Sequence, residues 1–332
     1  MTSLHLLFLV LFLSNVFLSI SSNSLTFHQV LDKIYKSDKM LKLAVAGGDS
    51  VSMIQCCRQA KDLKIVDSIL IGDAEKIHAA AKEANTDISD FEIVDIKDEV
   101  EIARYAIKLV HDKKADIYSK GNIETQIFID PIYDPEIGLK TNKQVSGVTI
   151  VEVEPLNRLM ILTDPHVIQY PNITHKVNII ENAVELAHSI GIVYPKVGVV
   201  TAFKDVHPKM KETTEADELV KMNTNGEIKG CVIDGPLPFE LCIDPDSPEY
   251  KEIEKRKIRG DADILLFPNI HAANIAYHFM THVLHYKSAT LVTGTSAPCL
   301  INSRAGSAEA KLNSVIISIG FSHYLKRLHG EN

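Results

Sequence analysis

The feature that most constrains the fold of this chain is the alternation of short apolar runs with longer helical stretches, which begins at Lys42. Strands separated by helices predict an α/β fold, with a parallel sheet and helices on its faces. The predicted strands cover residues 43–46, 65–71, 91–96, 116–119, 196–201, 230–234, 262–267 and 289–293. The predicted helices cover residues 50–63, 73–84, 99–113, 176–190, 214–223, 272–284 and a final stretch from about 307.

The alternation stops between residues 130 and 163. Two strands, 148–153 and 159–162, follow one another here with turn residues between them and no room for a helix. This spacing predicts a hairpin or a region of mixed sheet. We place the boundary between two domains at this break in the pattern.

Composition excludes several classes of protein. The chain has 332 residues, enough for two α/β domains or one large one, and 45% of them are hydrophobic. The formal charge is −8 and tryptophan is absent, which argues against a nucleic-acid binder. Any phosphorylated ligand would therefore need a local basic pocket.

The cysteines and histidines do not form a recognisable metal or disulfide motif. The five cysteines include no C-x-x-C pair, and we expect them to be small buried apolar side chains. His278 and His282 share a helix face at i,i+4 spacing, but no glutamate completes an HExxH pattern. We therefore expect no metal site.

Residues 1–24 form an apolar leader. Residues 4–18 are mostly apolar, and residues 19–24 are mostly small and polar, as in a secretory signal peptide. The apolar run is short for a membrane-spanning helix, which needs about 20 residues. The alternative is a start codon placed upstream of a cytosolic enzyme.

The segment 295–314 is the most informative for function. The apolar run Cys299–Ile301 ends at Asn302, Ser303 and Arg304, and small residues then open a helix near Ser307. Strand ends of this kind face the ligand crevice in α/β proteins. A hydroxyl beside a guanidinium, with helix N–H groups nearby, can hold an anion and activate a nucleophile. The alternative is a surface turn with a charged rim.

An ordered series of motifs accompanies this segment. The series is Pro208-Lys209-Met210, Asp234-Gly235-Pro236-Leu237, the GDADILLFPN stretch at 260–269, Asn274, Ser-Arg-x-x-Ser at 303–307 and Lys-Leu-x-Ser at 311–314. In this order the motifs resemble the phosphate acetyl/butyryl transferase family, and its butyryl branch most closely. The resemblance extends from Leu41 to Leu328.

The resemblance implies a fold, a reaction and an assembly. It implies two doubly wound α/β domains flanking a cleft, of the isocitrate/isopropylmalate dehydrogenase type. The first domain would be residues 25–146 plus 302–332, and the second 147–301. The family moves a short acyl group, butyryl or acetyl, between coenzyme A and inorganic phosphate. Coenzyme A is then a substrate, no cofactor is expected, and the family forms homodimers or higher homo-oligomers. Such proteins are typically cytoplasmic, whereas the leader suggests secretory entry.

The resemblance also assigns roles around Ser303. Ser303 matches the serine thought to orient or deprotonate the thiol, and Arg304 matches the adjacent phosphate-binding arginine. Asn302 and Ser307 could line the same anion site.

Two acidic positions of the family are lost. The acetyl branch places an aspartate seven residues after the serine, where this chain has Ala310. The butyryl branch often places an aspartate three residues after the serine, where this chain has Gly306. Glu309 is the nearest acid, and we nominate it as the substitute base.

Further ligands are expected at other strand ends and loops. Lys120 and Thr125 match the family's lysine-glycine-x-x-x-threonine stretch, although Lys120 could equally belong to an ordinary turn. The remaining substrate-binding candidates are Arg158, Lys209, Asp234, Gly235 and Asn274. For Arg158, the alternative is a surface arginine in a hairpin turn.

Three functions are open at this point. The first is a phosphate acyltransferase. The second is a non-catalytic protein that binds acyl-CoA or acyl phosphate, favoured by the leader and by Gly306 and Ala310. The third is a metal- and NAD-dependent decarboxylating dehydrogenase, a group that shares the two-domain architecture, but the chain lacks a convincing aspartate cluster for its metal.

Overall fold

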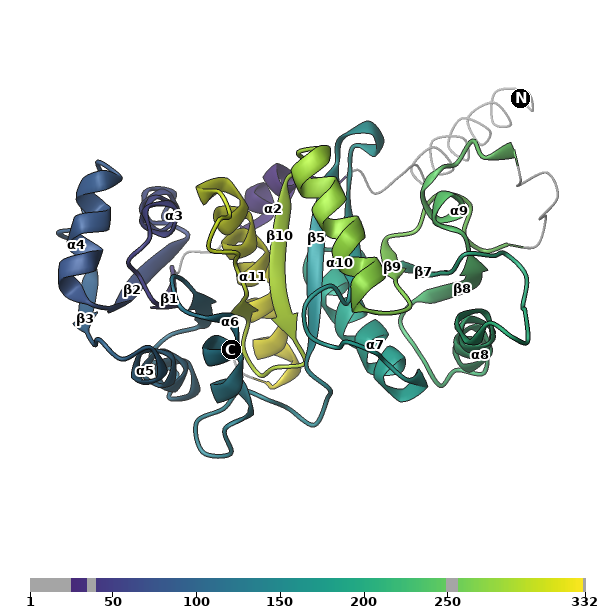
Figure 1. Ribbon diagram of the computed structural model, residues 1–332, viewed down its shortest axis with the longest axis horizontal. Coiled ribbons are helices and arrows are strands. Elements are labelled where there is room, and N and C mark those ends of the chain that lie inside the picture. The colour runs from purple at the N-terminus through teal and green to yellow at the C-terminus, as the bar shows by residue number, and fades with distance from the viewer. Residues whose placement is uncertain (1–24, 35–39, 249–255, 331–332) are drawn as a thin grey trace, which may run out of the picture.

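The computed structural model describes residues 25–34, 40–248 and 256–330 (Figure 1). The predicted leader, residues 1–24, lies outside the described residues. Among the described helices, none has both the length and the apolar character needed to cross a membrane.

Eleven described strands pair into one continuous mixed sheet, in the order β3-β2-β1-β4-β11-β10-β5-β6-β9-β7-β8. The strands are β1 (Leu41–Ala46), β2 (Val66–Gly72), β3 (Glu92–Asp95), β4 (Ile117–Lys120), β5 (Ser146–Val153), β6 (Arg158–Thr163), β7 (Lys196–Val200), β8 (Val232–Leu237), β9 (Ile264–Leu266), β10 (Ser288–Thr293) and β11 (Cys299–Leu300). In Figure 1 the sheet runs along the long dimension of the molecule, from β3 at one end to β7 and β8 at the other.

Strand direction reverses in the middle of the sheet. β1 to β4 and β11 run parallel to one another, and β6 to β9 form a second parallel group. β10 is antiparallel to both β11 and β5, and the hairpin β5–β6 is antiparallel as predicted. The carboxyl ends of the two parallel groups therefore lie at opposite edges of the sheet.

Helices cover both faces. The main helices are α2 (Phe27–Ile34), α3 (Val51–Asp62), α4 (Ala74–Glu83), α5 (Glu99–His111), α6 (Thr125–Ile129), α7 (Ile173–Ser189), α8 (Lys211–Thr224), α9 (Phe239–Ile243), α10 (Ile270–His278) and α11 (Ala308–Leu328). Short helical turns occupy Asp130–Tyr133 and Glu154–Leu156, and the π-helical turn η4 (Phe279–Val283) continues α10. The last helix, α11, packs against α2, α3, α7 and β10.

Side-chain alternation along the strands produces the two faces. In β1, Leu43 and Val45 belong to the core beneath α3, α7 and α11, whereas Ala44 and Ala46 belong to the core beneath α5 and α6. A third core lies beneath α9 and α10, around β6 and β9. Because a strand points successive side chains to opposite faces, these cores place the sheet between two helical layers.

The predicted strands agree closely with those observed. The bounds of one strand and one helix differ from the prediction in ways that affect the site. β8 continues through Leu237, so Asp234 and Gly235 lie inside the strand and not at its end. The helix predicted over 272–284 begins at Ile270 and changes to the π-helical turn after His278. The short helices α2, α6 and α9 were not predicted.

Candidate active site

The site begins where two strands from distant parts of the sequence end side by side. β11 pairs in parallel with β4, with Leu300 opposite Ser119. The next residues, Lys120 on one strand and the segment 302–304 on the other, therefore leave the sheet at the same edge. β1 lies on the other side of β4, with Ala46 opposite Lys120.

The loops after β1 and β4 are in backbone contact. The N–H of Gly121 donates to the carbonyl of Ala46 at 2.8 Å, and the N–H of Asn122 donates to the carbonyl of Gly47 at 2.7 Å. A Cβ at Gly121 would lie 1.9 Å from the Gly47 oxygen, so only glycine permits this approach. The contact fixes the backbone after Lys120 beside the start of α3.

Lys120 is a buried cation. Its residue is 2% exposed, and its Nζ lies 3.4 Å from the carbonyl of Gly121, its only hydrogen-bond partner among the described residues. Burial lowers the pKa of Lys120 to about 8, and the nearby charges of Arg304 and Lys311 lower it further. No carboxylate of the described chain forms an ion pair with it.

Lys311 is a second buried cation, which sequence reasoning missed. It lies in the first turns of α11, is 2% exposed, and donates to the Ser52 hydroxyl at 2.9 Å and to the Gly306 carbonyl. Burial lowers its pKa as well. A sequence signal was present, because Lys311 precedes Val315 and Ser318 at i+4 and i+7 on a helix face that packs against the sheet.

Arg304 completes the group of cations. Its residue is exposed, and its Nε donates to the carbonyl of Ile123 at 3.2 Å. Its two terminal guanidinium nitrogens have no partner within the described parts of the chain. Lys120, Lys311 and Arg304 are hereafter called the cation cluster. Three cations that form no ion pair with a carboxylate of the described chain repel one another, so this arrangement is suited to a multiply charged anion such as phosphate.

Ser303 lies in a cleft of about 280 Å³ next to this cluster. One wall is formed by the start of α11 and the loop before it, and the other by the end of α10, the turn η4 and the start of β10. Asn313 lines the cleft. Asn313 and Asn302 are both buried, and the side-chain Nδ2 of each has no hydrogen-bond partner in the described structure.

Other candidates near Ser303 have different positions. The Ser307 hydroxyl caps α11 by accepting a hydrogen bond from the N–H of Ala310 at 3.1 Å. The Glu309 side chain is 61% exposed at the cleft, and its Oε1 lies 3.6 Å from the Nζ of Lys287. Thr125 is exposed at the first position of α6.

Arg158 and Asp234 serve the interior of the fold. The Arg158 guanidinium donates to the carbonyls of Ala262 at 2.9 Å and Gly260 at 3.1 Å. Asp234 pairs with Arg256 at 3.0 Å and also accepts hydrogen bonds from the N–H groups of Lys257 and Ile258. Both side chains are therefore held by partners within the protein.

Gly235, Lys209 and Asn274 have three different local surroundings. A Cβ at Gly235 would come within 2.8 Å of the Val199 Cβ, so this glycine permits close strand packing. Lys209 is exposed in the loop between β7 and α8. The Asn274 amide donates to the carbonyl of Pro165 at 3.1 Å and fastens α10 to the loop after β6.

The described residues contain no group of three or more side chains suited to hold a metal ion. The rings of His278 and His282 stack with their centroids 5.3 Å apart. Both histidines line the Ser303 cleft.

Comparison with known proteins identifies relatives along nearly the whole chain. Residues 100–319 match the model of the "Phosphate acetyl/butaryl transferase" family. The chain is 38% identical over 293 residues to a phosphate butyryltransferase of Clostridium acetobutylicum, covering 88% of this chain and 97% of the relative. It is 34% identical over 281 residues to a phosphate acetyltransferase of Thermotoga maritima, covering 85% and 95%.

A solved structure has a similar fold. A branched-chain phosphotransacylase from Enterococcus faecalis superposes with a TM-score of 0.75 at 26% identity. The superposition covers 86% of this chain and 99% of that structure.

Proposed function

The chain belongs to the phosphate acetyl/butyryl transferase family, and we propose that it exchanges a butyryl or acetyl group between coenzyme A and inorganic phosphate at the cation cluster. The observation that carries the proposal is the burial of Lys120 and Lys311 without a carboxylate partner. Burying a charge without a partner of opposite charge costs roughly several kcal/mol. Phosphate, or the phosphoryl group of an acyl phosphate, supplies the missing negative charge.

The cleft provides the remaining requirements of the reaction. The thiolate of coenzyme A attacks the carbonyl carbon of the acyl phosphate, a carbon–sulfur bond forms, and phosphate leaves. Arg304 and Lys120 hold the phosphoryl oxygens and neutralise the charge that develops on them. Ser303 orients the thiol, and the unpartnered amides of Asn302 and Asn313 are available to donate to the oxyanion. Holding both substrates in one cleft lowers the entropic part of the barrier.

The reaction as proposed uses coenzyme A as a substrate and needs no metal or redox cofactor. The test is release of free thiol from butyryl-CoA and acetyl-CoA by the full chain, with and without phosphate, in buffer containing EDTA. We expect release that requires phosphate and is lost in Ser303→Ala and Arg304→Ala. Turnover that stops when EDTA is added would contradict the metal-free reaction.

A second candidate is a protein that binds acyl-CoA or acyl phosphate without turnover. The observation that favours it is the absence of a carboxylate at positions 306 and 310 beside Ser303. In the same assay this candidate predicts measurable binding of coenzyme A with no release of thiol.

We propose that the chain forms two α/β domains, residues 25–146 plus 302–332 and residues 147–301, that flank the cleft. The reversal of strand direction between the two parallel groups supports this division. Domains that flank a cleft close on their substrates, so small-angle scattering should show a smaller radius of gyration with coenzyme A and phosphate. An unchanged radius would favour a single rigid body.

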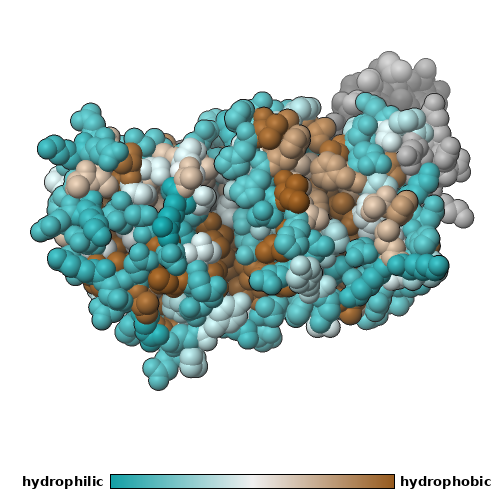
Figure 2. All heavy atoms as spheres, viewed as in Figure 1, coloured by the Kyte–Doolittle hydropathy of each residue, from teal (hydrophilic) through white to brown (hydrophobic). Residues whose placement is uncertain are grey.

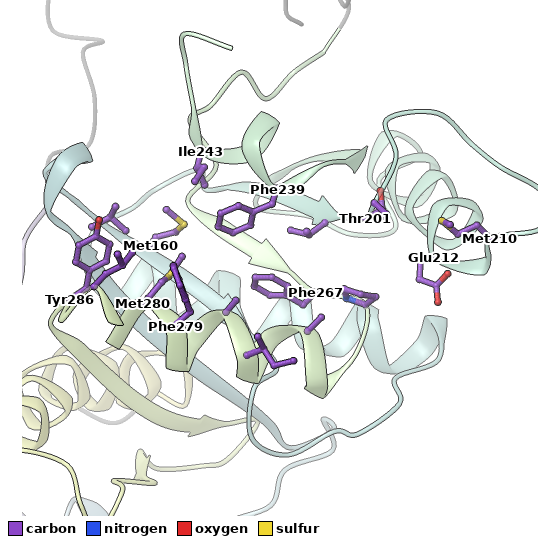
Figure 3. A pocket seen from close by; sticks show the side chains of 18 residues that line it. Met160, Thr201, Met210, Glu212, Phe239, Ile243, Phe267, Phe279, Met280 and Tyr286 are labelled. Atoms are coloured by element: carbon purple, nitrogen blue, oxygen red, sulfur yellow. The ribbon is translucent and has the colours of Figure 1, made fainter. Parts of the chain in front are cut away.

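We also propose that the chain forms a homodimer through an apolar face of α10 and η4. Ile275, Phe279, Val283 and Leu284 are exposed there, and Figure 2 shows apolar side chains gathered in this region. Beside them lies an apolar cavity of about 720 Å³, bordered by Met160, Phe239 and Phe267 (Figure 3). Light scattering should give twice the chain mass, and Phe279→Glu should give the monomer. A monomeric wild-type chain would contradict the proposal.

A further inference from the structure

The proposed reaction needs a proton acceptor for the thiol, and the described residues beside Ser303 lack the expected one. The thiol of coenzyme A has a pKa of about 8.5, so most of it carries a proton at neutral pH. Gly306 and Ala310 border the cleft where an acid would serve. Glu309 has a carboxylate, but its side chain is 61% exposed and faces Lys287. The carboxylate is therefore paired with a cation of the cleft wall, whereas a general base must face the thiol.

The opposite wall of the same cleft contains histidines. His278 lies at the end of α10 and His282 lies one turn later in η4, and both line the cleft with Ser303. Asn274, one turn before His278, holds α10 to the loop after β6 through its bond to Pro165. The wall that presents His278 is therefore anchored to the sheet.

The His278 residue is exposed at the cleft, as Glu309 is, but its surroundings favour its neutral form. Its ring packs 4.6 Å from the Tyr277 ring and 5.3 Å from the His282 ring, measured between centroids. The titratable groups around it are His282 and His285 on its own segment, Tyr286 and Lys287 before β10, Glu309 on α11, and the buried His166. Burial, and secondarily His282, lower the pKa of His278 below its ordinary 6.5. A neutral imidazole can accept a proton at physiological pH.

We infer that His278 is the general base for the thiol of coenzyme A in this chain, acting from the wall opposite Ser303. The inference rests on the proposed function. As the thiol sulfur bonds to the acyl carbon, its S–H bond breaks and the proton moves to a ring nitrogen of His278. The carbon–oxygen bond to phosphate breaks, and phosphate leaves the acyl carbon with that electron pair. In the reverse direction the imidazolium returns the proton to the departing thiolate.

The first test is the pH dependence of His278→Gln, which keeps a polar side chain but cannot accept the proton. In wild type, kcat/KM for coenzyme A with butyryl phosphate should rise as the pH passes upward through the pKa of His278, which lies below 6.5. In the variant kcat should fall at least about 100-fold, the range of general-base catalysis, and this acidic limb should disappear. KM for butyryl phosphate should stay the same, which separates a lost base from a distorted cleft.

The matched controls are His282→Gln and Glu309→Gln, which change titratable groups of the same cleft. Both should keep the acidic limb and most of the wild-type kcat. A variant His278→Gln with wild-type kcat and an intact acidic limb would overturn the inference, as would loss of the limb in Glu309→Gln. Absence of turnover in the wild-type chain would overturn the proposed function itself, and the inference with it.

A rescue variant tests the idea that His278 replaces a missing acid. A Cβ at Gly306 would lie 3.7 Å from the Ser303 Cβ and 3.6 Å from the Lys311 Nζ, with a tighter 3.1 Å contact to the Ser303 carbonyl. Gly306→Asp would therefore place a carboxylate beside Ser303. In the His278→Gln background it should raise kcat at least about tenfold over that of His278→Gln alone. No gain in kcat in a well-folded double variant would count against the idea that His278 replaces the missing acid.

Discussion

The two parallel groups of strands differ in how they use buried charge. Around β6 to β9, charged side chains have partners within the described chain: Arg158 is held by two carbonyls, and Asp234 by Arg256. Around β4 and β11, Lys120 and Lys311 are equally buried but have no carboxylate partner there. Removing the partner of a buried charge destabilises the fold, whereas a buried charge that has no protein partner of opposite charge is itself costly and indicates a ligand. Buried cations without a carboxylate partner therefore indicate the position of the site more directly than the positions of the strand ends do.

The sharpest test of this difference replaces one arginine in each region with glutamine. Arg304→Gln should lower kcat/KM for phosphate by about 100-fold or more, because a preorganised cation is lost from the developing charge. Its unfolding temperature should change little, since Arg304 is exposed. Steady-state kinetics and thermal unfolding measure both effects.

Arg158→Gln should show the reverse pattern. It breaks the bonds to Gly260 and Ala262 and leaves Asp263 without its nearby charge, at 3.9 Å in the native fold. Unfolding free energy should drop by about 3 kcal/mol, while KM for phosphate stays at the wild-type value. A large change in that KM, in protein that remains folded, would erase the distinction between the regions.

Lys120→Met should lose activity and gain stability. One pKa unit corresponds to about 1.4 kcal/mol, so the shift from 10.5 to about 8 sets an upper limit of about 3.5 kcal/mol for the gain at pH 7. The cost of the buried charge is present below pH 8 and disappears as the pH rises from 8 to 10.5. Thermal unfolding in phosphate-free buffer should therefore show a gap between variant and wild type that narrows over this range. A variant less stable than wild type would indicate a structural role for Lys120.

Phosphate affinity should weaken with rising pH. Lys120 loses its proton as the pH rises through about 8, which removes one cation from the cluster, and the affinity should fall at most about tenfold per pH unit. The shift in unfolding temperature that phosphate causes is a convenient measurement. Lys120→Arg is the matched control, because a guanidinium stays charged over this range, and its affinity should depend less on pH.

The smallest effect is expected at Glu309. Its ion pair with Lys287 is exposed, and such pairs contribute about 0–1 kcal/mol. Glu309→Gln should leave the unfolding temperature near that of wild type, and kcat nearly unchanged. A large loss of kcat would indicate that Glu309 is the base and that the thiol loses its proton to the α11 side of the cleft.

Local sequence pattern was sufficient for most strands and for the long helices, but not for the short helices α2, α6 and α9 or for the arrangement of the strands. Apolar runs predict β1, β2 and β4 because burial on both faces needs continuous apolar residues. The place of β11 between β4 and β10 depends on pairing between strands nearly 180 residues apart, which no local pattern specifies. The sequence placed candidate ligands at the ends of strands in both parts of the chain, and the antiparallel β10 and β5–β6 hairpin place the ends of β6 to β9 at the opposite edge from those of β4 and β11.

The same limit explains which site residues could be predicted. Ser303 and Arg304 follow a short apolar run within one continuous motif, so the sequence itself brings them together. Arg158 and Asp234 have the same local signature, but their partners come from segments 22 to 104 residues away. Lys311 shares a helix face with Val315 and Ser318, but its contact with Ser52 joins residues 259 positions apart, which the helix pattern alone does not specify.

The most direct measurement of the central claim is calorimetric titration of inorganic phosphate into the wild-type chain, Lys120→Met and Arg158→Lys. We expect phosphate to bind the wild type and Arg158→Lys, and binding to be lost in Lys120→Met although that variant remains folded. Undiminished phosphate binding in folded Lys120→Met would contradict the claim that the unpaired cations at the ends of β4 and β11 form the phosphate site.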